Sequence, residues 1–128
     1  MTGLRDPDTE SAVIQWLKAW MGEGWYVHAE GEQLTTRPVP AIAVARAGGT
    51  GYDVDSDDTI EVTVVERDRA ALWPACAEVT AAMRAIVGRG VAMVDEVEVT
   101  GRFAIADPNP NPDTRRASAL FRLTVRPQ

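Results

Sequence analysis

The sequence predicts an α+β fold with two layers, in which two helices pack on one face of a mostly antiparallel β-sheet. Two segments carry apolar residues with the period of a helix, and other segments alternate apolar and polar residues as half-buried strands do. The 128 residues suit one domain, and they contain no internal repeat or long linker. We therefore expect a single domain over residues 1–128, with the element order α-β-β-β-α-β-β.

The first helix is predicted by its N-terminal signals and by an apolar stripe. Asp6 suits the N-cap and Pro7 suits the first helical position. Asp8 and Glu10 place negative charge in the first turn, where the helix dipole is positive. Two glycines after the stripe end the helix. The stripe consists of Val13, Trp16, Leu17, Trp20 and Met21.

Three strands are predicted after this helix. The third has the clearest pattern, because apolar Ile60, Val62 and Val64 alternate with polar residues, as in an antiparallel strand with one face in water. Proline residues precede the second strand and separate it from the first. The three predicted strands are Trp25–Glu30, Ala41–Ala47 and Thr59–Glu66.

A second helix is predicted over Arg69–Val87, where alanines fill the positions between apolar residues. Pro74 is compatible with this helix only in its first turn, because proline lacks the N–H that later turns use. Gly88 and Gly90 close the helix. The apolar residues that keep the helical period are Leu72, Cys76, Val79, Met83, Ile86 and Val87.

Two more strands, Val91–Thr100 and Ala117–Arg126, are predicted from alternation. In the first of them Val97 and Val99 point inward, and the acidic residues between and beside them point outward. The polar faces of these strands leave the second side of the sheet open to water or to a neighbour. The inward residues of the last strand are Ala119, Phe121, Leu123 and Val125, and its outward residues are Ser118, Arg122, Thr124 and Arg126.

Two loops are candidate contact surfaces. Gly48–Asp58 is rich in glycine and aspartate, and Asp107–Arg116 carries three alternating prolines. The prolines favour an extended conformation that loses little entropy when it meets a partner, so the second loop is a candidate docking arm. A solvated hairpin connection explains the same composition. The candidate interface residues are Gly49, Tyr52, Asp53, Asp55, Asp57, Asp58, Asn109, Asn111, Asp113, Arg115 and Arg116.

The acidic loop resembles a calcium loop only in part. Asp53, Asp55 and Asp57 have the spacing of the first three ligands. However, Asp58 occupies the position of the required glycine, and Val64 that of the bidentate glutamate. We therefore expect no bound metal.

No residue pattern predicts a catalytic site. His28, the single histidine, has no cysteine near it in the sequence, and we expect it to be a half-buried structural residue. Cys76 lies on an apolar helix stripe, where an inert core thiol is the usual state. No serine lies in a nucleophile elbow. The chain is therefore expected to be no enzyme and to use no cofactor.

Charge and cysteine content narrow the partners. The net charge of −6 argues against affinity for nucleic acid, which depends on Lys and Arg displacing counterions. One cysteine allows no internal disulfide, which favours a reducing compartment. No apolar run approaches the roughly 20 residues that cross a bilayer. We expect a protein made in the cytoplasm, with no membrane partner.

The order of these features carries a family resemblance. An amphipathic helix with a Trp-Leu-x-x-Trp pattern opens the chain, and Arg37–Gly49 (Arg-Pro-Val-Pro-Ala-Ile-Ala-Val-Ala-Arg-Ala-Gly-Gly) leads into the acidic loop. An alanine-rich helix, an Asp-Pro loop at Asp107 and the segment from Arg115 to Arg126 follow. In order and length, over nearly the whole chain, this resembles the tail terminator proteins of siphophages, the long-tailed bacteriophages, of the actinobacteriophage kind.

The resemblance implies a structural role in the virion. Such proteins form a six-membered ring that stops growth of the tail tube and meets the head connector, with DNA passing through the lumen without specific binding. The expected partners are other copies of the chain, the tail tube protein and the head-tail connector or completion protein. A ring of this kind needs two different patches on each subunit. We assign the outward strand residues and Gly48–Asp58 to subunit and tube contacts, and Asp107–Arg116 to neighbours or the connector.

Two alternatives stay open from the sequence. A related head-to-tail joining or tail-completion protein would share ring assembly and composition, and only its position in the virion separates it from a terminator. A small cytosolic ligand-binding or regulatory domain belongs to a different class. Stabilisation by a ligand, or a dimer in a mass measurement, would favour this second alternative.

Overall fold

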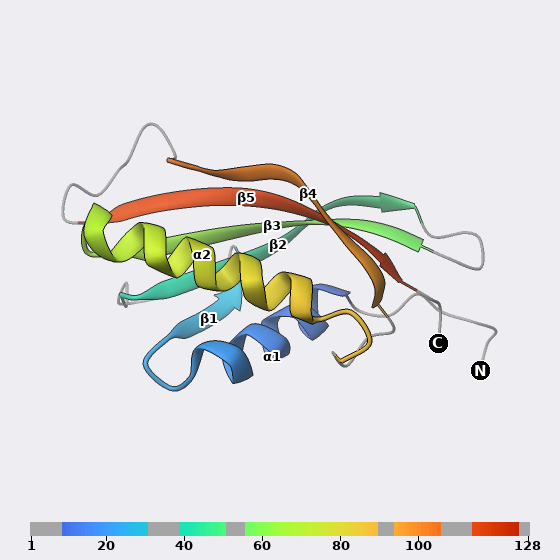
Figure 1. The fold of residues 1–128 in the computed structure, drawn as a ribbon, viewed down its shortest axis with the longest axis horizontal. Helices are drawn as coiled ribbons and strands as arrows, with labels where there is room; N and C mark the ends of the chain where they lie inside the picture. The colour runs from blue at the N-terminus through green and yellow to red at the C-terminus, as the bar shows by residue number, and fades with distance from the viewer. Residues whose placement is uncertain (1–8, 31–38, 51–55, 90–93, 106–113, 126–128) are drawn as a thin grey trace.

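The computed structural model describes residues 9–30, 39–50, 56–89, 94–105 and 114–125. They form an α+β fold in which two helices cover one face of a five-stranded sheet (Figure 1), so the predicted fold class and element order are confirmed. In chain order the elements are α1 (Thr9–Met21), β1 (Tyr26–Ala29), β2 (Ala41–Thr50), β3 (Ser56–Glu66), α2 (Arg69–Ala85), β4 (Val94–Ile105) and β5 (Arg115–Val125).

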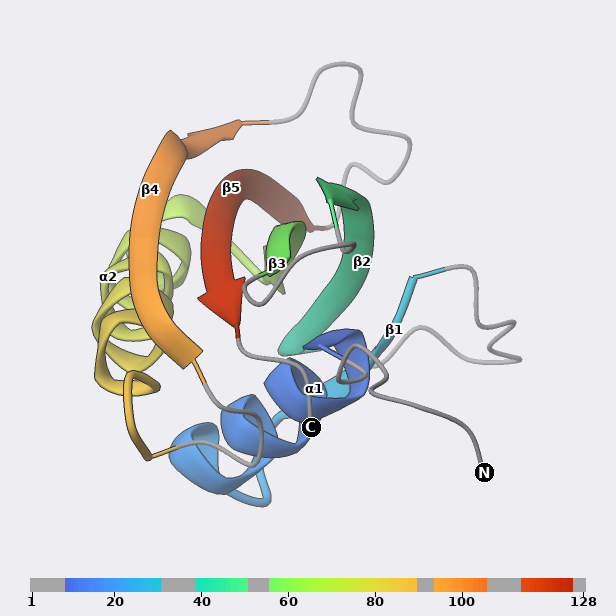
Figure 2. The same ribbon diagram turned by 90° about the vertical axis from the view of Figure 1, so that its right-hand side faces the viewer.

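The strands lie in the order β1-β2-β3-β5-β4, which is visible across the sheet in Figure 2. Strand β1 runs parallel to β2, and all other neighbours are antiparallel. The chain passes from β3 through α2 to β4 at the far edge, and β5 then returns between β3 and β4. The two edge strands, β1 and β4, therefore lie on opposite sides of the molecule.

The core fills the space between the helices and the inner face of the sheet. Ile60, Val62 and Val64 of β3 are fully buried, as their alternation predicted. The predicted inward residues of β5 are buried too, while Val97 and Val99 of β4 are partly buried against the same core. Phe103 of β4 also joins it, with its ring edge-on to Phe121 at a centroid distance of 6.1 Å.

Helix α1 buries a narrower stripe than the sequence predicts. Val13 and Leu17 are buried as expected, but Trp20 is 38% exposed and Trp16 is only partly buried. The reason is that α2 lies beside α1, and both tryptophans reach sideways to it rather than into the sheet. The proposed N-cap, Asp6, lies outside the described residues.

Helix α2 begins at an N-cap and ends earlier than expected. The Asp68 carboxylate accepts a hydrogen bond from the Ala71 N–H at 2.9 Å. Pro74 lies in the second turn rather than the first, on the exposed side of the helix, where water can satisfy the backbone carbonyl that proline leaves without a donor. The helix ends at Ala85, so Val87 is 40% exposed and is not part of the buried stripe.

Four strands extend past their sequence patterns, and one of them is β5, which begins at Arg115. Strand β2 continues to Thr50, β4 to Ile105, and β3 begins at Ser56. In each case backbone pairing extends past the alternating residues. The β2–β3 ladder runs through a bulge at Arg46/Gly48, and the β4–β5 ladder through several bulges. Backbone pairing does not depend on side-chain polarity, which explains why alternation underestimates these strands.

Candidate assembly surfaces

The described residues of the predicted Gly48–Asp58 loop lie in the paired strands β2 and β3. Gly49 pairs with Asp58, and Thr50 pairs with Asp57, across β2 and β3. Tyr52, Asp53 and Asp55 lie outside the described residues. The prediction of a loop from Gly48 to Asp58 was therefore wrong at both ends, since Gly49, Asp57 and Asp58 belong to strands.

Asp58 is a buried structural residue and not a surface contact. The residue is 1% exposed, and its Oδ2 accepts a hydrogen bond from the Thr9 hydroxyl at 2.5 Å. Oδ1 lies 2.7 Å from Arg46 Nη2, an ion-pair contact without the alignment of a hydrogen bond. The backbone N–H of Arg46 donates to Glu10 Oε2 at 3.0 Å. Together these contacts join the start of α1 to the β2–β3 hairpin.

Asp57 is engaged on the opposite side of β3. Its Oδ1 accepts a hydrogen bond from the Thr124 hydroxyl of β5 at 3.0 Å. The carboxylates of Asp57 and Asp58 therefore contact different elements and do not converge on one point. Among the residues that the structure describes, no cluster of His, Cys, Asp or Glu could hold a metal ion.

The last residues of the second predicted loop, Asp107–Arg116, also belong to a strand. Arg115 and Arg116 are the first residues of β5, paired with Glu66 and Val65 of β3, so their assignment to a loop was wrong. Arg115 Nη1 donates to the Thr114 carbonyl at 2.9 Å. The structure describes nothing of the prolines before them, and the candidate residues Asn109, Asn111 and Asp113 also lie outside the described residues.

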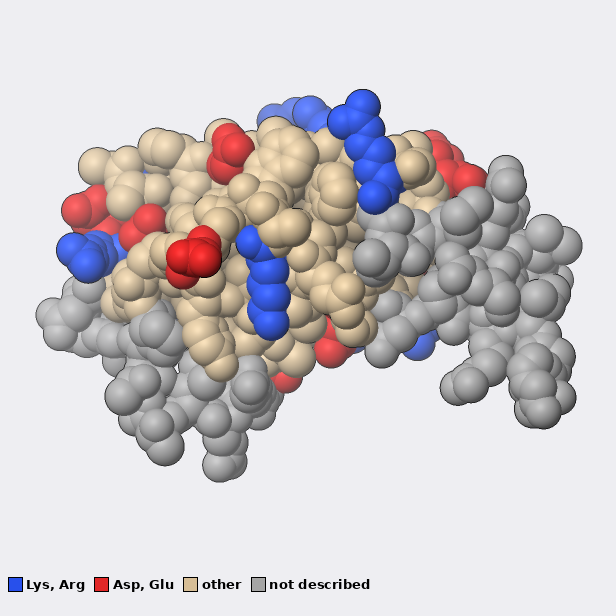
Figure 3. Space-filling view, turned by 90° about the horizontal axis from the view of Figure 1, so that it is seen from below, with Lys and Arg blue, Asp and Glu red and all other residues tan. Residues whose placement is uncertain are grey.

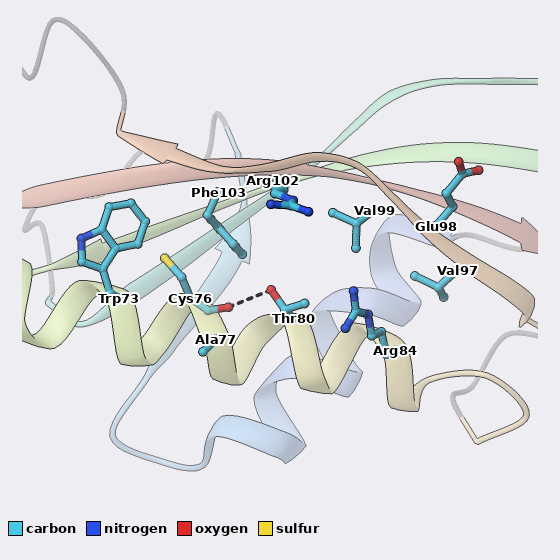
Figure 4. Close-up of a pocket in the computed structure, with 10 residues that line it drawn as sticks. All are labelled: Trp73, Cys76, Ala77, Thr80, Arg84, Val97, Glu98, Val99, Arg102 and Phe103. Atoms are coloured by element: carbon cyan, nitrogen blue, oxygen red, sulfur yellow. Dashed lines mark hydrogen bonds between the residues drawn. The ribbon is translucent and has the colours of Figure 1, made fainter.

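A groove between α2 and the edge strand β4 is a surface that sequence analysis did not predict. It has a volume of about 700 Å³. Figure 4 shows Trp73, Cys76 and Phe103 gathered at one end, with Val97 and Arg84 toward the other. Trp73 is 43% exposed, an unusual state for the largest apolar side chain of a helix. Bulges in β4 bend this strand, and α2 covers its inner face only in part.

The charges of this groove are mostly basic. Arg84 belongs to α2, and Arg102 belongs to β4. Neither side chain forms an ion pair within the described part of the chain. Glu98, the one acidic residue of the lining, is paired with Arg122 of β5. The groove therefore presents two basic side chains in a protein whose net charge is −6.

Cys76 lies in the floor of this groove as an inert thiol. It is 3% exposed, and burial raises its pKa from 9.0 to about 11. The Thr80 hydroxyl donates to the Cys76 backbone carbonyl at 2.9 Å and does not act on the sulfur. The thiol is thus protonated near neutral pH, as expected of a core cysteine.

A second groove lies at the opposite edge of the sheet, between the C-terminal half of α1 and β1. Its volume is about 990 Å³, and its lining includes Lys18, Glu23, Trp25 and His28. His28 is partly buried, as predicted. Its ring lies 5.0 Å from that of Tyr26, and its Nδ1 is 2.9 Å from the Ala29 carbonyl.

The centre of the sheet's outer face carries small side chains. Its central row crosses four strands through small side chains, Ala43, Thr63, Ser118 and Ala104. The hydroxyls of Thr63 and Ser118 are hydrogen-bonded at 2.7 Å. On the helix side, Figure 3 shows isolated Lys, Arg, Asp and Glu side chains on a mostly uncharged described surface.

Comparison with solved structures finds chains that are similar to this one. The chain is similar to a chain of the virion of a native gene transfer agent particle, at 19% sequence identity and a TM-score of 0.40. The similarity covers 91% of this chain and 93% of the other. No protein-family model matches the sequence, and no curated protein is significantly similar to it. In the described part of the chain, no helix is long and apolar enough to cross a membrane.

Proposed function

We propose that this chain is a structural virion protein and not an enzyme: a tail terminator that caps the tail tube as a hexameric ring and presents a surface to the head connector. The observation that carries the proposal is the position of the two grooves. They lie at opposite edges of one sheet and differ in lining and charge. A ring subunit needs two such different patches, because each neighbour contacts a different side.

The sequence supports the same role. The resemblance to siphophage tail terminators covers nearly the whole chain and both helices. The net charge of −6 suits a subunit whose ring lets DNA pass without adhering, because an acidic wall repels phosphate. In this proposal the partners are other copies of the chain, the tail tube protein and the connector, and the site of action is the head-proximal end of the tail.

Tube growth in the presence of the purified protein tests the proposal. The cognate tail tube protein is polymerised with and without the chain, and tubes are imaged by negative stain. We expect rings on one end of each tube and an arrest of elongation when the chain is added first. An unrelated acidic protein of similar mass serves as the control. Unchanged tube lengths with bare ends would overturn the proposal.

Labelling in assembled particles separates a terminator from a neighbouring joining protein. A tagged chain, located by gold labelling in virions, is expected at the junction of tail and head. In tail-only particles from a mutant that makes no heads, a terminator stays on the tail. A protein that joins the tail only through the head side would be absent from those tails.

A further inference from the structure

The two edge strands offer regular segments of equal length. The longest segment of β4 in uninterrupted register with β5 runs from Glu96 to Val99, between two bulges. Strand β1, at the other edge, is four residues long, Tyr26–Ala29. No described strand covers the outer side of β4 over this segment. An exposed edge of this kind is a ready template for pairing with another strand.

The grooves beside the two edges lie on the same layer of the molecule. One lies between α2 and β4, the other between α1 and β1, and α1 and α2 cover the same face of the sheet. If β4 of one copy were placed against β1 of a second, α2 would therefore come to lie beside the second copy's α1. The two grooves would then merge, and Trp73 and Trp25 would lose their contact with water.

The arginines of the α2–β4 groove are opposite in charge to glutamates at the β1 edge, while Glu96 and Glu98 of β4 alternate with the inward Val97 and Val99. The α2–β4 groove is lined by Arg84 and Arg102, whereas the exposed Glu23 lines the α1–β1 groove and the exposed Glu30 directly follows β1. Neither glutamate forms an ion pair within the described residues, and Lys18 is the one basic residue of the groove lining there. Contact between two identical β4 edges would instead bring arginines against arginines, which disfavours a two-fold dimer through this groove.

We propose that the α2–β4 groove of one copy receives the β1 edge of the next copy, with Arg84 and Arg102 facing Glu23 and Glu30. The contact is heterologous, so it joins copies head to tail and closes a ring when the rotation between copies divides the circle. The inference rests on the proposed function for its ring, and it names the surfaces that form it. The outer face of the sheet stays open for other virion proteins.

Charge reversal and mixing of variants test this contact. One variant carries Arg84→Glu and Arg102→Glu, and a second carries Glu23→Arg and Glu30→Arg. All four side chains are exposed, so both variants should fold, which circular dichroism checks. Each variant alone should self-associate about tenfold more weakly than the wild type or worse, measured by mass photometry and sedimentation at low salt. Arg67→Glu, an exposed arginine outside both grooves, is the matched control and should leave assembly unchanged.

An equimolar mixture of the two variants should restore rings. In the mixture the acidic groove of the first variant meets the basic edge of the second, and the unaltered groove of the second meets the unaltered edge of the first. The restored rings should alternate the two variants and contain an even number of subunits. A chain that carries all four substitutions should also assemble, because its groove and edge are again opposite in charge.

The outcomes separate this inference from the proposed function. If both variants assembled as well as the wild type, or if their mixture stayed dissociated, the proposed contact would be wrong. Neither result would contradict the proposed capping of the tail tube. Rings that depend on these charges but ignore tail tubes would support the contact and count against the terminator role. A wild-type chain that remains monomeric at high concentration and on tube ends would overturn both.

Discussion

Asp58 joins three elements through one carboxylate. Thr9 at the start of α1 donates to it, and Arg46 of β2 lies against its other oxygen. The aspartate is almost fully buried, whereas the Arg46 side chain is half exposed and keeps much of its hydration. The ion pair therefore costs less desolvation free energy than a fully buried pair. We expect the stability of the fold to depend more on the buried hydrogen bond between Thr9 and Asp58 than on this ion pair.

We expect Asp58→Ala to lower the free energy of unfolding by about 1–3 kcal/mol, because it removes the buried hydrogen bond from the Thr9 hydroxyl and the contact with Arg46. Asp58→Asn keeps an acceptor oxygen and should cost less. Asp57→Ala is the matched control, since it removes one hydrogen bond from a less buried site and should cost at most about 1 kcal/mol. Urea unfolding measures all three. Equal losses for Asp57→Ala and Asp58→Ala would contradict this account of the Asp58 site.

The buried thiol of Cys76 should react in a pH-dependent way that reports its environment. Burial raises its pKa from 9.0 to about 11, so near pH 8 the native thiolate is about a hundredfold scarcer than in the unfolded chain. We expect alkylation of the native protein to rise steeply only toward pH 11. Between about pH 9 and 11 the native state keeps a proton that the unfolded state releases, so stability falls as pH rises.

Alkylation rates of native and urea-unfolded protein, measured across the same pH series, check this prediction. Access as well as ionisation slows the native reaction, because Cys76 is hardly exposed. The midpoint of the pH profile, rather than the absolute rate, is therefore the informative quantity. A native midpoint near that of the unfolded thiol would show that the sulfur is solvated.

At the scale of elements, Trp16 completes the C-terminal end of α2 from a different helix. The Ile86 N–H, whose helical acceptor would be the Ala82 carbonyl, donates to Met83 instead. The Trp16 indole N–H donates to the Ala82 carbonyl at 2.7 Å. A carbonyl that the helix end leaves without its usual donor is thus satisfied by α1.

Trp16→Phe should lower the free energy of unfolding by about 1–2 kcal/mol, because it keeps an aromatic ring but removes the donor to a part-buried carbonyl. Trp20→Phe is the matched control: its indole N–H bonds to Glu78 at an exposed position, and its loss should cost under about 0.5 kcal/mol. Thermal unfolding followed by circular dichroism measures both. A larger loss for Trp20→Phe would show that exposed contacts join the helices.

The strands and the groove beside β4 show which parts of the fold the sequence can predict. The inward residues of β3 and β5 were predicted correctly because side-chain alternation follows from strand geometry alone. The extent of β2 and β3 was not, because Gly49 and Asp58 pair through their backbones despite a composition typical of loops. The α2–β4 groove exists because β5 lies between β3 and β4, which places β4 at the edge of the sheet. The local sequences of α2 and β4 contain no pattern that indicates this strand order. The exposed Trp73 could not be distinguished from a core tryptophan for the same reason.

At the scale of the whole molecule, one core cluster contains residues of both helices and all five strands. Leu17 of α1 and Phe121 of β5 are both fully buried in it. Neither helix has a separate core, and the edge strand β1 contributes Val27 to the same cluster. Loss of packing at either end of the sheet therefore weakens the contacts on which the other end depends, which favours a single cooperative unit.

We therefore expect two-state unfolding of the dissociated chain, with tryptophan fluorescence and far-ultraviolet circular dichroism giving the same urea midpoint. Phe121→Ala should lower the free energy of unfolding by about 3–5 kcal/mol and Leu17→Ala by about 2–5 kcal/mol, and each should shift both signals together. Three of the four tryptophans lie on or beside α1 and α2, so fluorescence mainly follows the helices, whereas circular dichroism also follows the sheet. If Leu17→Ala moved the fluorescence midpoint alone, α1 would unfold as a separate unit, and the single-domain interpretation would be wrong.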